Sequence, residues 1–247
     1  MSIQPGLLQP AAEPETAPVS APQTEAEISP MPAASEAWRV NRLAEEQIRR
    51  LVWQVFIPGW PKPARHVVFC AVDPGVYVAE ICMDVARELS TQVAGSVCVI
   101  EANPQNPALE EIFGRKEKEK RYDDEKDEFN LVRSLCQHVS GNLWLAPRRV
   151  LNGEGARAPA WLERRTTDLR LEFDYTLYHA PPAGLSGEAA LLGNMSDGVV
   201  LVIEANSTRR ISAQRAKEML YSANARVLGA VLSERTFPLP ESIYRRL

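Results

Sequence analysis

Short apolar segments alternate with helical patterns along most of this chain. The apolar segments are almost continuously apolar, which is typical of strands that are buried on both faces. The expected strands are residues 66–71, 96–101, 143–146, 175–178, 198–204 and 225–232, and the helical patterns are residues 77–89, 107–113, 126–138, 160–173, 187–194 and 210–222. Strands that alternate with helices predict an α/β fold, with a mostly parallel twisted sheet and helices on both faces.

The beginning of the chain has a different composition. Residues 1–34 are rich in Pro, Ala, Glu, Gln and Ser and poor in large apolar residues, so they cannot bury enough surface to offset the entropy of ordering. We therefore predict a disordered tail over residues 1–34 and a single α/β domain over residues 35–247. Ser35 is a good N-cap, and residues 35–56 are expected to form an N-terminal helix that ends before Pro58.

Charge and cysteine usage exclude several classes of protein. The net charge of −4 gives no electrostatic basis for binding nucleic acid or an anionic membrane surface. No apolar run approaches the roughly 18 to 20 residues that span a bilayer, and the N-terminus lacks the pattern of a signal peptide, so a cytoplasmic protein is expected. The 4 cysteines show no C-x-x-C spacing, which predicts reduced thiols and neither a metal site nor a disulfide.

A strand, a glycine turn and a helix follow one another at residues 67–89. The strand-like run ends at Ala71, the chain turns at Pro74-Gly75, and a helical pattern follows. This arrangement is the usual cradle for an anion, because free backbone N–H groups at the helix N-terminus point toward the ligand. The residues that would hold a phosphate are absent from it.

Four motifs resemble those of one family. They are E-A-W-R-V-N-R at 36–42, D-P-G-V-Y-V-A-E at 73–80, V-C-V-I-E-A-N-P-Q-N-P at 97–107, and F-D-Y-T-L-Y-H-A-P-P at 173–182. In this order they resemble the cytoplasmic kinase domain of bacterial tyrosine autokinases of polysaccharide synthesis, which belong to the partition-type ATPases with deviant Walker motifs. The resemblance implies a P-loop NTPase-like fold that binds ATP and Mg²⁺ in active members.

The phosphate loop departs from the family's P-G-E-G-K-S/T pattern. Tyr77 places a bulky side chain where a glycine lets the backbone approach the phosphates. Val78 replaces the lysine that neutralises them, Ala79 replaces the hydroxyl expected on Mg²⁺, and Glu80 repels a polyphosphate. If each lost charge-assisted contact is worth roughly 1.5 to 3 kcal/mol, ATP binding weakens by several orders of magnitude. The vestigial loop comprises Asp73, Pro74, Gly75, Tyr77, Val78, Ala79 and Glu80.

The acidic positions of the family are also altered. Glu101 keeps a carboxylate on a longer stem, Asn103 replaces the second aspartate, and His179 replaces the Walker B aspartate. Neutral imidazole cannot take the place of a carboxylate as a partner of hydrated Mg²⁺. Because His179 has no partner at a recognisable spacing, we predict a structural or merely tolerated histidine. No catalytic residue, metal ligand or cofactor is expected.

The first motif resembles the family's E-x-x-R-x-x-R element, which helps subunits pack into a ring. A spacing of three places Glu36, Arg39 and Arg42 within about one helical face, where they could contact a neighbour. The alternative is a solvated helix held by its own salt bridges.

These observations predict a catalytically inactive, tyrosine-kinase-like protein that acts as a regulatory or scaffolding partner in exopolysaccharide or capsule biosynthesis and export. The expected partner is a working kinase or a membrane chain-length regulator, the protein could form homo- or hetero-oligomers, and the membrane is reached only through a partner.

Two alternatives stay open at this point. One is an active, ATP-dependent tyrosine autokinase or ATPase with a rearranged site, in which Glu101 and Glu80 hold the metal and Arg209 or Arg210 holds phosphate. The other is a partition-type positioning protein without a polysaccharide role.

Tyr244 is the one tyrosine near the C-terminus, where active members usually carry a tyrosine-rich tail.

Overall fold

The computed structural model describes residues 33–57, 63–109, 132–151 and 159–234, and it describes side chains from residue 44 onward. The chain divides into two units, Met1–Val40 and Asn41–Leu247. The strands are β1 (His66–Ala71), β2 (Val97–Glu101), β3 (Gln137–Ser140), β4 (Leu143–Ala146), β5 (Tyr175–His179), β6 (Gly198–Glu204) and β7 (Val227–Ser233). The α-helices are α1 (Ala33–Phe56), α2 (Val78–Gln92), α4 (Pro159–Glu172), α5 (Glu188–Asn194) and α6 (Arg210–Ser222), with 3₁₀ turns η2 (Val132–Leu135) and η3 (Arg148–Val150).

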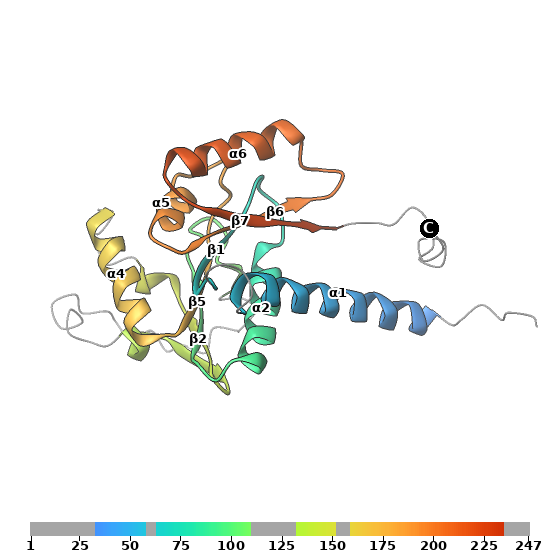
Figure 1. Ribbon diagram of the computed structural model, residues 1–247, viewed down its shortest axis with the longest axis horizontal. Helices are drawn as coiled ribbons and strands as arrows, with labels where there is room; N and C mark the ends of the chain where they lie inside the picture. Colours follow the sequence, from blue (N-terminus) through green and yellow to red (C-terminus); the bar gives the residue numbers. More distant parts are fainter. Residues whose placement is uncertain (1–32, 58–62, 110–131, 152–158, 235–247) are drawn as a thin grey trace, which may run out of the picture. The chain divides into compact units, whose positions relative to one another are not determined.

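The seven strands form one sheet in the order β3-β4-β2-β5-β1-β6-β7. Figure 1 labels β2, β5 and β1 at the centre of this sheet. Every pair of neighbours is parallel except β3 and β4, which are antiparallel. The central strands β1 and β2 are buried at every position, as their continuous apolar runs predict. The expected α/β fold, a mostly parallel sheet with helices on both faces, is confirmed.

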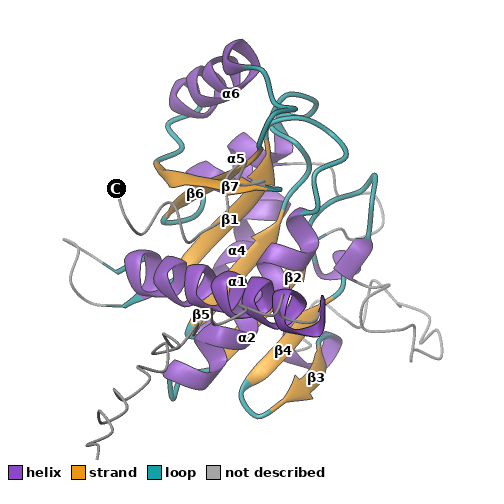
Figure 2. Ribbon diagram, turned by 90° about the vertical axis from the view of Figure 1, so that its right-hand side faces the viewer, coloured by secondary structure: helices purple, strands orange, loops and turns teal. Residues whose placement is uncertain are grey.

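Each face of the sheet has its own core. Val67 and Phe69 of β1 point to the face where they join Val52 and Phe56 of α1 and the buried stripe of α2. Val68 and Cys70 point to the opposite face, where residues of α4, α5 and α6 cover them. Figure 2 shows α2 in front of the strands and α4 and α5 behind them. Because successive side chains of a strand point to opposite faces of the sheet, neighbouring residues of β1 belong to different cores.

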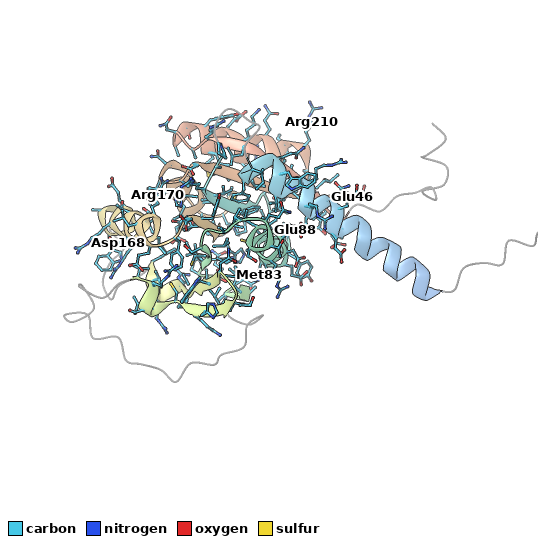
Figure 3. The ribbon with its side chains drawn as sticks, turned by 60° about the horizontal axis from the view of Figure 1, so that its bottom comes forward. Glu46, Met83, Glu88, Asp168, Arg170 and Arg210 are labelled. Atoms are coloured by element: carbon cyan, nitrogen blue, oxygen red, sulfur yellow. The ribbon has the colours of Figure 1, made fainter. Side chains whose placement is uncertain are left out.

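Helix α2 is held both by its apolar face and by contacts to α1. Its buried residues recur at the spacing of one helical face: Val78, Ala79, Cys82, Met83, Val85, Ala86 and Leu89. On its outer side, Arg49 Nε donates to Glu88 Oε1 at 2.9 Å, and Trp53 Nε1 donates to Gln92 Oε1 at 2.6 Å. Figure 3 shows Glu88 beside α1. These contacts fix α2 against the C-terminal part of α1.

One expected helix is wrong. The pattern at residues 126–138 predicted a helix, but the described part of it contains only the single turn η2 and the start of β3. Gly141, with φ of 54°, reverses the chain so that β3 pairs with β4 as a hairpin. His138 Nε2 lies 2.9 Å from the Gly141 carbonyl oxygen at this turn. The other expected strands and helices agree with the described ones to within a few residues. Of the helix expected at residues 107–113, only residues 107–109 are described, because residues 110–131 lie outside the described part.

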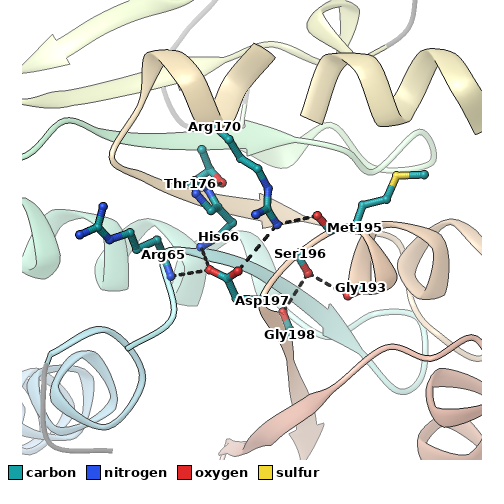
Figure 4. A network of polar contacts seen from close by, with 9 residues as sticks. All are labelled: Arg65, His66, Arg170, Thr176, Gly193, Met195, Ser196, Asp197 and Gly198. Carbon is teal, nitrogen blue, oxygen red and sulfur yellow. Dashed lines mark hydrogen bonds and ion pairs between the residues drawn. The ribbon is translucent and has the colours of Figure 1, made fainter. Parts of the chain in front are cut away.

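A polar network closes the amino-terminal ends of β1, β5 and β6 (Figure 4). Asp197 Oδ2 accepts the backbone N–H groups of Arg65 at 2.7 Å and His66 at 2.8 Å. Arg170 Nη2 lies 3.7 Å from Asp197 Oδ1 and donates to the Met195 carbonyl at 2.6 Å. The network therefore joins the loop before β6 to the start of β1 and to α4.

His66 lies next to this network, and its side chain is buried. Its Nδ1 lies 2.8 Å from Thr176 Oγ1 on the neighbouring strand. Burial, followed by the nearby positive charges of Arg170 and Arg65, lowers the pKa of His66 to about 4, although Asp197 opposes the shift. The folded protein therefore keeps this imidazole neutral at pH values where an unfolded chain binds a proton.

The stability of the protein should depend on pH through this histidine. Between pH 6.5 and about 4 the unfolded state binds more protons at His66 than the folded state, so stability falls as the pH is lowered. His66→Gln is expected to remove roughly 2 to 3 kcal/mol of the acid-induced loss between these pH values. Urea unfolding of both proteins at pH 7, 5.5 and 4.5 measures this. Parallel pH dependences in the wild type and the variant would contradict the prediction.

None of the described helices combines the length and the apolar character that crossing a bilayer requires.

Candidate functional site

The predicted site residues lie at the carboxyl ends of three neighbouring strands. In the order β2-β5-β1, Glu101 is the last residue of β2, His179 is the last residue of β5, and the loop after β1 follows Ala71. The connection from β1 to β2 leaves in one direction, and the connection from β5 to β6 leaves in the other. Ligands of open α/β sheets bind outside the carboxyl ends of strands at such a change of direction.

The loop after β1 closes on itself before α2 begins. Gly75 has φ of 91°, a conformation that glycine adopts freely. Tyr77 has φ of −78° and ψ of 64°, and the N–H of Val78 donates to the Val76 carbonyl at 2.9 Å. These values are those of an inverse γ-turn. The Val78 N–H, at the first position of α2, is therefore bonded within the chain and does not point to a phosphate.

The side chains of this loop separate into a buried and an exposed set. Val78 and Ala79 are buried in the core between α2 and the sheet. Tyr77 is 67% exposed, so most of its ring surface faces solvent and does not fill the loop. Pro74 and Glu80 are also exposed, and Asp73 is partly exposed. The loop is thus closed by its backbone and by two apolar side chains, and not by the aromatic ring.

Glu101 and His179 form a buried pair. His179 Nδ1 lies 2.8 Å from Glu101 Oε1, and the two residues are direct neighbours in the register of β2 and β5. Glu101 is 0% exposed and His179 is 3% exposed. The backbone N–H of Asn103 donates to Glu101 Oε1 at 2.9 Å, and that of Leu109 donates to Oε2 at 3.0 Å. Both carboxylate oxygens are therefore satisfied by the protein.

This pairing corrects one expectation. No partner was expected for His179, because sequence separation alone gave none, yet Glu101 lies opposite it across two adjacent strands. The sequence did indicate that Glu101 and His179 are each the last residue of a strand. That position predicts their contact only when β2 and β5 are known to be neighbours in the sheet.

Asn103 also has a local structural role. Its side-chain Oδ1 accepts the backbone N–H of Gln105 at 3.0 Å and that of Asn106 at 3.4 Å. Asparagine commonly closes turns in this way. With Glu101 binding the N–H groups of Asn103 and Leu109, two side chains at the end of β2 shape the loop over residues 102–109.

The loop after β5 is fastened to the end of β1. The N–H of Ala183 donates to the Ala71 carbonyl at 2.9 Å, and that of Gly184 donates to the Val72 carbonyl at 3.2 Å. A Cβ atom on Gly184 would lie 2.9 Å from the Val72 carbonyl oxygen, so only glycine allows this approach without a shift of the backbone. The loops after β1 and β5 are held together by main-chain contacts.

The structure thus brings together the residues of the second, third and fourth motifs. Glu36, Arg39 and Arg42 lie within α1, and their side chains fall outside the described ones. Within the described residues there is no group of three or more His, Cys, Asp and Glu side chains that could hold a metal ion. Burial, with a secondary contribution from Glu101, raises the pKa of the Cys82 thiol, which is consequently a core thiol near the pair.

Comparison with known proteins supports the fold and the resemblance. No protein-family model matches the chain. The tyrosine-protein kinase CpsD of Streptococcus agalactiae is 27% identical over 119 residues, which cover 42% of this chain and 51% of that protein. The kinase domain of VpsO superimposes with a TM-score of 0.64 at 16% identity, covering 81% of this chain and 100% of that domain. A plasmid partition protein of Borrelia burgdorferi gives 0.53 at 16% identity, covering 74% of this chain and 87% of that protein.

The sheet order and these superpositions define a P-loop NTPase-like α/β protein. Its homologues are bacterial tyrosine kinases, with partition-type ATPases among its structural neighbours, so the resemblance drawn from the four motifs is confirmed. The match to CpsD spans about half the length of that kinase.

Proposed function

We propose that this chain is a tyrosine-kinase-like protein that does not turn over ATP and acts as a binding partner in the synthesis and export of a surface polysaccharide. The observation that carries the proposal is the buried pair of Glu101 and His179. A hydrated Mg²⁺ needs carboxylate oxygens that remain open to it and to its waters. Here both oxygens of Glu101 are bound by protein donors, and His179 stands at the position of the family's Walker B aspartate.

The phosphate side supports the same proposal. Val78 supplies no ammonium group, Ala79 supplies no hydroxyl, and both side chains are buried in the core. The N–H of Val78 is bonded to Val76 and is not free for a phosphate oxygen. A phosphate loop usually provides free backbone donors, a cation and a metal ligand. In this loop the Val78 N–H is already bonded, and the side chains at positions 78 and 79 provide neither a cation nor a metal ligand.

The partner follows from the relatives. Because homologues of this chain are tyrosine kinases, the partner that we propose is a working tyrosine kinase or a membrane chain-length regulator of a polysaccharide assembly system. The chain would then work in the cytoplasm at the inner face of the membrane, held there by that partner. Glu36, Arg39 and Arg42 would provide the contact, in a homo- or hetero-oligomer.

The test is the response of the purified full chain to nucleotide. A ligand present at about 100 times its Kd stabilises a protein by about 2.7 kcal/mol, which raises the Tm of a domain of this size by several degrees. We expect 1 mM ATP with Mg²⁺ to change the Tm by less than about 1 °C, and we expect no phosphotyrosine after incubation. A nucleotide-dependent shift together with autophosphorylation that is lost in Glu101→Ala would show the proposal to be wrong and would favour a rearranged kinase site.

A further inference from the structure

Two free thiols meet in the core on the α4 side of the sheet. Cys98 lies in β2 and is 0% exposed, whereas Cys136 lies between η2 and β3 and is half-buried. Cys136 packs against the core that contains Cys98, and the two side chains are joined by a hydrogen bond. No close spacing in the sequence links these cysteines, so their contact is a product of the fold.

The turn η2 holds Cys136 over this face of the sheet. Val132 is buried in the same core, and the backbone N–H groups of Val132 and Arg133 both donate to the Glu172 carboxylate of α4. The Cys136 N–H donates to the Arg133 carbonyl at 3.1 Å, and its Sγ lies 3.3 Å from the Val132 carbonyl oxygen. Cys98 is held more firmly, because β2 pairs with β4 on one side and β5 on the other. Any movement that brings the two sulfur atoms closer therefore falls mainly to Cys136.

A positive charge lies near the thiol pair. The Arg133 guanidinium is 4.9 Å from the ring centroid of Trp144 and 4.8 Å from that of Phe173, and its Nε has no hydrogen-bond partner among the described residues. Burial and then the hydrogen bond with Cys136 raise the pKa of the Cys98 thiol, and the charge of Arg133 opposes this shift. Reactive thiols typically lie near such a cation and have some access to solvent. Cys136 is the more exposed thiol of the pair, so a soluble oxidant reaches it first.

We propose that Cys98 and Cys136 are an oxidation site, which reacts with a peroxide to form a disulfide between β2 and the start of β3. The Cys136 thiolate attacks one oxygen of hydrogen peroxide and breaks the O–O bond, which leaves a sulfenic acid on Cys136 and releases one water. The Cys98 sulfur then attacks the sulfenic sulfur and gives up its proton, and a second water leaves. One peroxide is thus reduced by two electrons, and two thiols are oxidised to one disulfide.

The disulfide would close the stretch of chain that carries Glu101 and the loop over residues 102–109. A cross-link stabilises a protein mainly by restricting its unfolded chain, and the gain grows with the length of the closed loop. Oxidation is therefore expected to raise the Tm by roughly 4 to 15 °C. This inference goes beyond the proposed function and does not depend on it.

Mass spectrometry of the purified full chain, treated with hydrogen peroxide and kept unreduced, tests the proposal. We expect the intact mass to fall by about 2 Da, because two thiol hydrogens are lost. Trypsin should then release residues 88–115 linked to residues 134–148, since arginines precede and end both peptides. The oxidised protein should melt at the higher temperature, and dithiothreitol should reverse the mass change and the Tm rise.

Two variants separate this pair from the other thiols. Cys136→Ser keeps a hydrogen-bond donor at the position and should abolish the mass loss, the linked peptides and the Tm rise. Cys82→Ala is the matched control, because Cys82 is a buried thiol of the opposite core, and its disulfide between β2 and β3 should form as in the wild type. The melting temperature of each reduced variant shows whether it is folded.

Three outcomes would overturn the proposal. The first is the addition of oxygen atoms to Cys136 without the loss of two hydrogens, which would show that the sulfur atoms do not reach each other. The second is a cross-link between two copies of the chain, seen as a dimer on a non-reducing gel. The third is an equal Tm rise in the wild type and in Cys136→Ser, because the effect of peroxide would then arise at another residue.

Discussion

Glu101→Ala is expected to lower the free energy of unfolding by about 3 to 5 kcal/mol. The substitution leaves His179 buried without its partner and leaves the N–H groups of Asn103 and Leu109 without an acceptor. An unsatisfied buried donor costs about 1 to 3 kcal/mol, and a small cavity adds to this. Because the carboxylate joins β2, β5 and the loop over residues 102–109, the loss should affect the whole carboxyl edge of the sheet.

Urea unfolding at pH 7 measures this change. Glu80→Ala is the matched control, because Glu80 is exposed at the start of α2 near the same edge, and its loss should change stability by no more than about 0.5 kcal/mol. His179→Ala and the double variant complete a cycle in which the two substitutions should not be additive. If Glu101→Ala changed stability as little as the control does, the pair would have no structural role.

Asp197→Ala is expected to cost roughly 2 to 4 kcal/mol. Its carboxylate accepts two backbone N–H groups at the start of β1, and hydrogen bonds to a charged acceptor are among the stronger ones in proteins. The ion pair with Arg170 adds little, since both side chains are about one-third exposed and 3.7 Å apart.

Asp197→Asn separates the two contributions. The asparagine oxygen can still accept both N–H groups, so this variant should lose about 1 kcal/mol, which is much less than the alanine variant loses. Asp84→Ala, at an exposed position of α2, serves as the control and should be nearly neutral. Equal losses in the alanine and asparagine variants would show that charge, and not hydrogen bonding, stabilises the amino-terminal ends of the strands.

Most strands and helices could be predicted from the sequence because each is set by a pattern of neighbouring residues. Continuous apolar runs such as residues 66–71 and 198–204 become strands of the same bounds, and the helix expected at residues 210–222 is α6. The β3 hairpin was missed because its four residues alternate between half-buried and exposed and carry no strong strand signal. Gly141 was the cue, since a left-handed residue between two short segments favours a hairpin.

The site was less predictable because it depends on strand order. Positions such as Val78 and Ala79 could be placed from the motif, and the structure shows them buried at the start of α2. The contact of Glu101 with His179 joins residues 78 positions apart, and the turn at Tyr77 is a matter of backbone angles. Neither follows from residue type. The predicted roles of Glu36, Arg39 and Arg42 stay predictions.

The main-chain hydrogen bonds from Ala183 and Gly184 to the end of β1 bear on how long the complexes of this protein last. A nucleotide switch needs loops with two positions of similar energy, so that cleavage of the bound phosphate can reset them. Loops that are held together by main-chain hydrogen bonds do not have two such positions to switch between. For a chain that works as proposed here, the lifetime of its complexes would be set by their dissociation rate alone.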